Sequence, residues 1–220
     1  MKKTIQKIMI EKTYKELARA KVEKARSRVW QDPNGFQYLA VWQNAALLRI
    51  LIRKYTLCLA LKNPYEKRLK AQMDDAARSV KRNIEEGWKR PTSGEYLQFL
   101  GYSQASLEEV RGDIRDNKQD GFLKSEPGST LAKLGINLRV SKGYAKGLVK
   151  GEPTEPGHPY CQALRNIEAS DLSYEVFQEL INKTDWLLRK LVVSLENKLA
   201  KEKKGQEIER ARIRNNVKGY

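Results

Sequence analysis

The sequence predicts an all-α protein built around an antiparallel up-down four-helix bundle. Apolar residues recur at every third or fourth position within residues 38–61, 64–87, 92–114 and 173–199, a spacing typical of amphipathic helices. Turn or capping residues precede each of these segments. The chain has 220 residues, 40% of them hydrophobic, which supports one core with appendages rather than two full domains.

The N-terminal residues 1–35 are predicted to form a basic helical arm outside the bundle. Residues 1–30 contain ten Lys and Arg against three Glu, and neither Gly nor Pro. Ile5, Ile8 and Leu17 form only a loose stripe among these charges, which favours an arm over a core element. The turn sequence DPNG at residues 32–35 then separates the arm from the bundle, because proline fixes φ and Asn-Gly tolerates positive φ.

The first two helices of the bundle differ in their apolar pattern. Residues 38–61 are apolar on more than one face, so this helix should be buried by several neighbours, and its surplus apolar surface predicts a homo-oligomer. Asn63 and Pro64 supply an N-cap and a first-turn proline for the second helix. Gly87 is predicted to end that helix as a left-handed cap, while Asn83 and Glu86 bond backbone groups or a neighbouring helix.

The third and fourth helices have clear starting signals. Thr92 and Glu95, three residues apart, form a capping-box pattern ahead of the third apolar stripe. Ser103 on this stripe is expected to be a small packing residue, since no base for a nucleophilic serine is visible nearby. Asp171 or Ser173 can cap the fourth helix, whose apolar stripe ends near residue 199.

Residues 118–160 form an insertion between the third and fourth helices. They hold seven of the 14 glycines and four of the seven prolines, so they predict a loop, with a short strand or hairpin at residues 131–140. A loop of this length is usually functional or disordered. The predicted organisation is therefore an arm at 1–35, a bundle at 36–200 that contains the insertion, and a basic tail at 201–220.

Four stretches of the sequence resemble a known family. They are LAVWQ at residues 39–43, residues 69–87, EYLQFL at 95–100 and SLEE at 106–109. In order and spacing they are similar to the 23S rRNA intervening-sequence family of four-helix-bundle proteins, which is related to the accessory variability determinant of diversity-generating retroelements. The resemblance covers roughly residues 37–116 and, more loosely, 172–199. The chain departs from the family at Lys81 and Arg82, where Ile-Pro is common, and at Glu85, where Ala is usual.

The resemblance implies a fold, an assembly state and a role. Members of the family are short up-down bundles linked with ring-shaped, commonly pentameric assembly. An RNA-related role follows, with structured retroelement RNA or ribosomal RNA as the ligand. The resemblance also implies a partner protein, a reverse transcriptase that this chain would serve as an accessory factor.

The residues needed for catalysis or metal binding are scarce. His158 is the single histidine, so the Glu-x-x-His elements of a di-metal bundle and the usual Ser-His or Cys-His pairs are missing. Two cysteines are too few for a structural zinc site, and the glycines at 143, 147 and 151 lack the Lys-Ser/Thr of a phosphate-binding loop. We expect no catalytic residue, no metal and no cofactor, and therefore no enzymatic activity.

The charge of the chain points instead to nucleic acid. The formal net charge is +16, and residues 1–30 and 198–220 contribute +7 and +5 of it, because each holds a surplus of Lys and Arg. Such blocks are often nucleic-acid arms, and Tyr14, Tyr144 and Tyr160 lie among basic residues where they can stack on bases. The candidate RNA-binding residues are Lys2, Lys3, Lys7, Lys12, Lys15, Arg19, Arg49, Arg53, Arg78, Lys81, Arg82, Lys89, Arg90, Lys142, Lys146, Lys201, Lys203, Lys204, Arg210, Arg212 and Arg214.

Two other classes of function stay open on the sequence alone. One is an assembly scaffold that docks a partner enzyme with little RNA contact. The other is a membrane-surface protein with a basic amphipathic N-terminus, which is weaker because the arm lacks Trp or Phe until Trp30. There is no run of eighteen apolar residues and no signal-peptide core, so we expect a cytoplasmic protein without a membrane partner.

Overall fold

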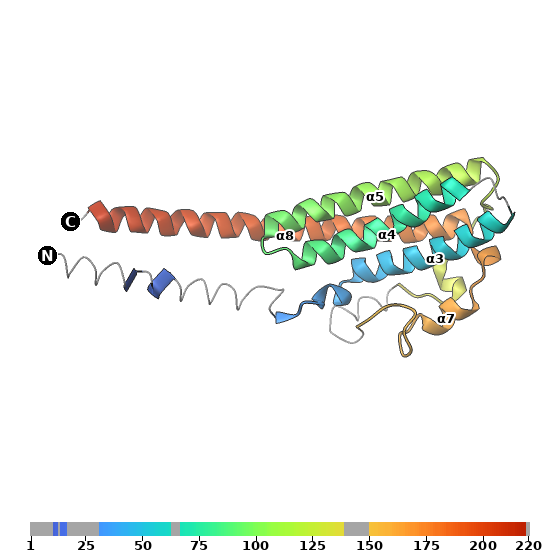
Figure 1. Ribbon diagram of the computed structural model, residues 1–220, viewed down its shortest axis with the longest axis horizontal. Helices are drawn as coiled ribbons and strands as arrows, with labels where there is room; N and C mark the ends of the chain where they lie inside the picture. The colour runs from blue at the N-terminus through green and yellow to red at the C-terminus, as the bar shows by residue number, and fades with distance from the viewer. Residues whose placement is uncertain (1–10, 13, 17–30, 63–66, 139–149, 219–220) are drawn as a thin grey trace.

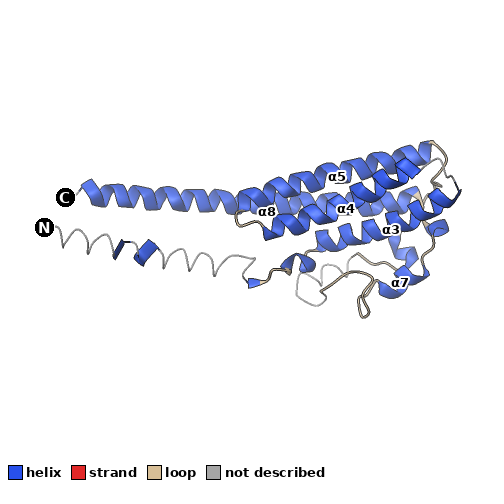
Figure 2. Cartoon of the chain, viewed as in Figure 1, coloured by secondary structure: helices blue, strands red, loops and turns tan. Residues whose placement is uncertain are grey.

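The computed structural model describes residues 11–12, 14–16, 31–62, 67–138 and 150–218. Within these ranges every regular element is a helix, so the predicted all-α class is confirmed (Figure 2). None of the described helices is both long and apolar enough to cross a membrane. The long helices are α3 (Ala40–Lys62), α4 (Lys67–Lys89), α5 (Ser93–Gln119) and α8 (Tyr174–Lys218), and the short ones are η1 (Gly35–Tyr38), η3 (Leu131–Leu134), α7 (Cys161–Asn166) and η4 (Ala169–Asp171).

The four long helices lie side by side around one apolar core (Figure 1). Helix α3 contacts α4 and α8, and α5 contacts the same two helices. Near the start of α3, Trp42 Nε1 donates a hydrogen bond to Glu85 near the end of α4, at 3.0 Å. Near the end of α3, Thr56 Oγ1 donates to Asp74 near the start of α4, at 2.7 Å. These contacts are compatible with a four-helix bundle.

Most of the first half of helix α3 is buried within the chain. All eight residues 41–48 are buried. Besides α4 and α8, the short helices η1 and η4 pack against α3, and Lys54 Nζ donates to the carbonyl oxygen of Ile167 at 2.9 Å. Near the end of the helix, Leu57 and Leu61 stay exposed, at 47% and 84%. Part of the surplus apolar surface is thus covered by short segments of the same chain, and the homo-oligomer stays a prediction.

Gly87 has a different role from the one predicted. Helix α4 continues past it to Lys89, and Gly87 is not among the glycines with positive φ, so it is not a left-handed cap. It is buried where α4 meets α5, and a Cβ atom built there would lie 2.5 Å from the ring of Tyr96 and 2.9 Å from Cβ of Phe99. Glycine at this position allows the two helices to approach closely.

Replacing Gly87 by alanine is therefore expected to destabilise the protein. The new methyl group must displace Tyr96 and the α5 backbone that carries Phe99, and such overpacking lowers the free energy of unfolding by about 1–3 kcal/mol. Gly101→Ala is the matched control, because nothing lies within 4 Å of its Cβ position and alanine favours a helix by up to about 1 kcal/mol. Urea unfolding of both variants measures the difference. Equal effects would show that α4 and α5 are not in close contact at Gly87.

The helix starts largely follow the predictions. Thr92 and Glu95 form the predicted capping box at the start of α5. Ser173 Oγ accepts a hydrogen bond from the backbone of Val176 at 3.4 Å, so Ser173, not Asp171, caps α8. Asn63 and Pro64 lie outside the described residues.

The fourth helix continues past residue 199, where its apolar stripe was predicted to end. Helix α8 runs on to Lys218 and extends beyond the other long helices (Figure 1). The predicted tail is thus helical, because residues 200–218 contain many helix formers and no proline.

The described part of the insertion packs against α3 and α8. Residues 131–134 form the turn of η3, so the predicted strand was wrong for residues 131–138, while residue 140 lies outside the described range. Leu131, Ile136 and Tyr160 are buried in the core. Tyr160 OH donates to the carbonyl oxygen of Asn137 at 3.0 Å, which ties the two described parts of the insertion together.

Candidate nucleic-acid interface

Arginines line the outer boundary between α3 and α4. The Trp42–Glu85 and Thr56–Asp74 contacts fix which sides of the two helices face each other. Residues seven apart in a helix lie on nearly the same side, so Arg49 on α3 shares the side of Trp42 and Thr56, and Arg53 follows one turn later. We call Arg49, Arg53, Arg78 and Arg82 the arginine edge.

On α4, the side that faces α3 is marked by Asp74, Lys81 and Glu85. Arg78 lies four residues from Asp74, at the solvent margin of this side, and Arg82 lies one turn further along. The two arginine pairs therefore lie on either side of the boundary between α3 and α4.

The cations of the arginine edge are largely unneutralised. Arg53, Arg78 and Arg82 are exposed, and Arg49 is half-buried. Arg82 lies 3.6 Å from a carboxylate oxygen of Glu85, and no ion pair joins the other three to any residue in the described part of the chain. Exposed guanidinium groups without a carboxylate partner are available to phosphate oxygens. They bind these oxygens through paired N–H donors.

Lys81 was expected on this surface, and that expectation was wrong. Its residue exposure is 8%, and its Nζ lies 3.0 Å from Glu85 and 2.5 Å from Glu152, which belongs to the insertion. The ammonium group also lies 5.1 Å from the ring centroid of Trp42. Lys81 is turned inward because two carboxylates and an aromatic ring surround it, and these groups offset its charge.

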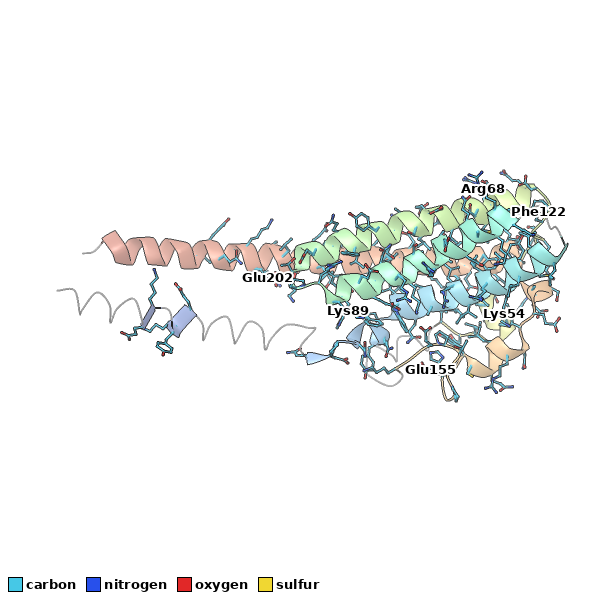
Figure 3. The ribbon with its side chains drawn as sticks, in the orientation of Figure 1. Lys54, Arg68, Lys89, Phe122, Glu155 and Glu202 are labelled. Carbon is cyan, nitrogen blue, oxygen red and sulfur yellow. The ribbon has the colours of Figure 1, made fainter. Side chains whose placement is uncertain are left out.

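Lys89 and Arg90 extend the basic surface to the end of α4. Both are exposed. Lys89 lies 5.8 Å from the ring centroid of Phe36, and Figure 3 shows it on the side of α4 that faces η1. Arg90 lies 4.5 Å from the ring centroid of Phe99. These cation–π contacts hold the two side chains at the surface, where a phosphate can reach them.

The remaining candidates lie far from the arginine edge or outside the described residues. Lys201, Lys203 and Lys204 are exposed on the part of α8 that extends beyond the other helices (Figure 1). Lys12 and Lys15 are exposed, and Lys15 lies 3.5 Å from Glu11. Arg210, Arg212 and Arg214 belong to α8, whereas Lys2, Lys3, Lys7, Arg19, Lys142 and Lys146 lie outside the described residues.

The outer boundary between α4 and α5 carries the opposite charge. Asp113 accepts a hydrogen bond from Gln72 at 3.3 Å, and its other carboxylate oxygen is buried without a hydrogen-bond partner. Burial, together with the negative charges of Glu109 and Asp116, raises the pKa of Asp113 from 3.8 to about 6. Helix α4 therefore separates a basic boundary from an acidic one, and phosphates should approach from the α3 side. Sequence reasoning missed Asp113, because its burial depends on α4.

The single histidine holds the insertion against α3. His158 Nδ1 accepts a hydrogen bond from the backbone of Tyr160, so Nε2 carries the proton that is shared with Gln43 Oε1 at 3.1 Å. Gln43 Nε2 donates to the carbonyl oxygens of Gln37 and Gly151. Burial lowers the pKa of His158 even though nearby Glu155 opposes this shift. His158 is thus placed as a structural residue.

Ser103 and the acidic side chains have similar structural surroundings. Ser103 Oγ donates to the carbonyl oxygen of Val80 at 2.8 Å, so Ser103 packs α5 against α4 as predicted. In the described part of the chain, no group of three His, Cys, Asp or Glu side chains is placed to hold a metal ion. The expectations of no metal and no catalysis stay predictions.

The arginine edge lies in a segment of the chain that matches a protein family. Residues 37–139 match the family model described as 23S rRNA-intervening sequence protein. The predicted family resemblance is confirmed over this segment. The matched segment includes α3, α4, α5 and η3, and with them all four arginines of the arginine edge. Searches of curated proteins and of solved structures gave no match to the chain.

The chain adds to the matched segment at both ends. Helix α7 and helix α8 lie outside residues 37–139, including residues 172–199, where the sequence suggested a looser resemblance. Two of the three departures from the family pattern, Lys81 and Glu85, lie in the contact with Glu152. These departures are explained by the insertion, since a charged pair on α4 suits the carboxylate that the insertion brings to it.

Proposed function

We propose that this protein binds RNA without catalysing a reaction, and that the arginine edge and the extended part of α8 contact RNA phosphates. The observation that carries the proposal is the row of arginines between α3 and α4, three of which have no carboxylate partner in the described chain. The matching family is described as 23S rRNA-intervening sequence protein, which favours RNA over DNA. The net charge of +16 supports binding to a polyanion.

The proposed binding surface is built on rigid elements. Arg53, Arg78 and Arg82 project from two packed helices, so their relative positions are set before RNA binds. Preorganised donors lose less conformational entropy on binding than cations on a flexible chain. The acidic boundary around Asp113 repels phosphates from the other side of α4 and so orients the RNA.

Reversing three charges of the arginine edge is the main test. The variant Arg53→Glu, Arg78→Glu, Arg82→Glu is expected to weaken RNA binding and to flatten its salt dependence. The slope of log affinity against log salt should fall by roughly 0.7–0.9 for each phosphate that the variant no longer binds. Fluorescence polarisation with a labelled structured RNA at several salt concentrations measures both quantities.

The matched control is Arg115→Glu, Lys124→Glu, Lys133→Glu. These three cations are also exposed, lie away from the boundary between α3 and α4, and change the net charge by the same amount. The control variant could reduce the RNA affinity and the slope of log affinity against log salt as much as the arginine-edge variant does. RNA binding would then depend on total charge, and the proposed surface would be rejected.

Deleting the charged ends tests their share of the affinity. Removing residues 1–30, or residues 201–220 at the end of α8, should leave the unfolding transition of the core nearly unchanged, because the described residues 201–208 are exposed. We expect weaker RNA binding with a flatter salt dependence and an unchanged sequence preference. Wild-type affinity and salt dependence in both truncations would exclude both charged ends, including the extended part of α8, and would limit RNA contact to the arginine edge.

We also propose how the four long helices are arranged and how copies of the chain assemble. We infer that the four long helices form an antiparallel up-down bundle with a basic arm, an insertion and a basic extension. We further propose a homo-oligomer, a pentamer by resemblance, that serves a reverse transcriptase as an accessory factor in the cytoplasm. Leu57 and Leu61, four residues apart near the end of α3, are exposed apolar side chains that fit an interface. Light scattering that gives 25.4 kDa would contradict the oligomer.

The second candidate function is a scaffold that docks a partner enzyme with little RNA contact. The exposed apolar side chains of α8 favour it, because they provide a protein-binding surface that does not need phosphate. An arginine-edge variant with wild-type RNA affinity, together with truncations that also bind normally, would move this function to first place.

A further inference from the structure

A cavity of about 750 Å³ lies between the first turns of α3, the turn of η3 and the middle of α8. Most of its wall is apolar and comes from Ala40, Ala132, Ile136 and Leu187. The volume is within the range of sites that bind small organic ligands. None of the contacts of the arginine edge uses this cavity.

One wall of the cavity carries a buried amide oxygen without a partner. Asn44 on α3 is 1% exposed, lines the cavity, and its Oδ1 makes no hydrogen bond in the structure. Burying such an acceptor without compensation is unfavourable, so most buried side-chain polar atoms are bonded. A ligand that offers an N–H donor would satisfy this oxygen.

The rim of the cavity has the other features of a nucleotide site. Trp186 lines it and is 52% exposed, so the indole can stack on an aromatic ligand. Lys190 Nζ lies 4.3 Å from the centroid of the Trp186 ring, and Lys183 also lines the cavity. Glu179 forms an ion pair with Lys183 and accepts a hydrogen bond from the backbone of Leu131, so the charges of Glu179 and Lys183 offset each other.

We infer that this cavity binds one unstacked base of the RNA that carries an exocyclic amino group, such as adenine. The Asn44 oxygen accepts a hydrogen bond from that amino group, the half-exposed Trp186 stacks on the base, and Lys190 beside the indole attracts the attached phosphate. A purely apolar ligand would leave the Asn44 oxygen unbonded. The inference rests on the proposed RNA-binding function and adds to it a site that recognises a base.

Titration calorimetry with adenosine monophosphate tests the site directly. We expect saturable binding to the full-length protein and none to ribose 5-phosphate, which lacks the base. Asn44→Leu should weaken adenosine monophosphate binding about tenfold or more, because it removes the oxygen that accepts a hydrogen bond from the base. Trp186→Leu should also weaken it. Asn197→Leu is the matched control, since Asn197 is exposed on α8 and does not line the cavity.

The results of these titrations distinguish a failure of the base-binding site from a failure of the proposed RNA-binding function. Asn44→Leu should unfold at the same temperature as the wild type or higher, because it removes an unbonded buried polar group. If it does not fold, the direct titration and Trp186→Leu decide. Unsaturable binding, or equal affinity in wild type and Trp186→Leu, would overturn the base site even if RNA still binds. Saturable adenosine monophosphate binding without RNA binding would support the cavity and reject the RNA proposal.

Discussion

Lys81→Met is expected to lower the free energy of unfolding by about 3 kcal/mol at pH 7. Removing one member of a buried ion pair leaves the other charge uncompensated, which typically costs about 3–5 kcal/mol. Methionine keeps the packing of the lysine stem, but Glu85 and Glu152 lose their cation. The lower end of the range applies because Trp42 Nε1 still donates to Glu85 and the Glu152 side chain is 32% exposed. Urea unfolding followed by circular dichroism measures the change.

Two further variants check the cause of this loss. Lys70→Met removes a similar pair on the same helix, but Lys70 and Asp74 are each 25% exposed, so the loss should be only about 0.5 kcal/mol. Neutralising the carboxylates in Lys81→Met, Glu85→Gln, Glu152→Gln should recover more than half of the stability. A Lys81→Met loss no larger than that of Lys70→Met would mean that the contact between α4 and the insertion behaves as a surface pair.

Asp113→Asn is expected to stabilise the protein by about 2–3 kcal/mol at pH 8 and to have almost no effect at pH 4. The pKa of Asp113 is raised from 3.8 to about 6 by burial and by Glu109 and Asp116. The folded protein therefore retains a proton that the unfolded chain releases between these pH values. The stabilising contribution of Asp113 is complete below pH 3.8 and is lost as the pH rises through 6. Asparagine avoids the buried charge at every pH.

An exposed aspartate on α4, Asp75, provides the control for Asp113. Asp75→Asn changes the same group at an exposed position of α4 and should alter stability by less than about 0.5 kcal/mol at either pH. The difference between variant and wild type is measured by urea unfolding across pH 4–8. A gain at pH 8 no larger than that of Asp75→Asn would show that Asp113 is solvated when folded.

His158 contributes to the same pH range with the opposite sign. Because burial lowers the pKa of His158, its contribution is complete above 6.5 and is lost as the pH falls through its folded value. The wild-type pH profile therefore combines a gain from Asp113 and a loss from His158 on acidification. Asp113→Asn removes the first of these, so the loss that remains below pH 6.5 should be larger and includes the effect of His158.

Much of the helical structure and the basic character could be predicted from the sequence. The apolar spacing predicted four long helices, and the pair Thr92 and Glu95 predicted the start of α5. The exposure of Arg53, Arg78 and Arg82 followed from the same spacing, because they lie off the apolar stripes. These features depend on residues within one or two helical turns, so the local sequence contains the information needed to predict them.

The roles of individual buried residues could not be predicted in this way. Lys81 looked like Arg78 and Arg82 in the sequence, yet it is buried against Glu152 from the insertion. Gly87 looked like a helix cap, yet it provides room for Tyr96. Asn44 has the helical position of a core residue, and only the meeting of α3, η3 and α8 leaves it facing a cavity.

The sequence by itself determined that this protein is helical, strongly basic and similar over residues 37–139 to the intervening-sequence family. Only the tertiary structure decided which cations are exposed without a carboxylate partner, what covers the first half of α3, and where a cavity lies. The physical reason is that helix formation and total charge depend on local sequence, whereas desolvation and ion pairing depend on partners brought together by folding. Lys81 and Arg82 are neighbours in the chain, and burial beside Glu152 separates their roles.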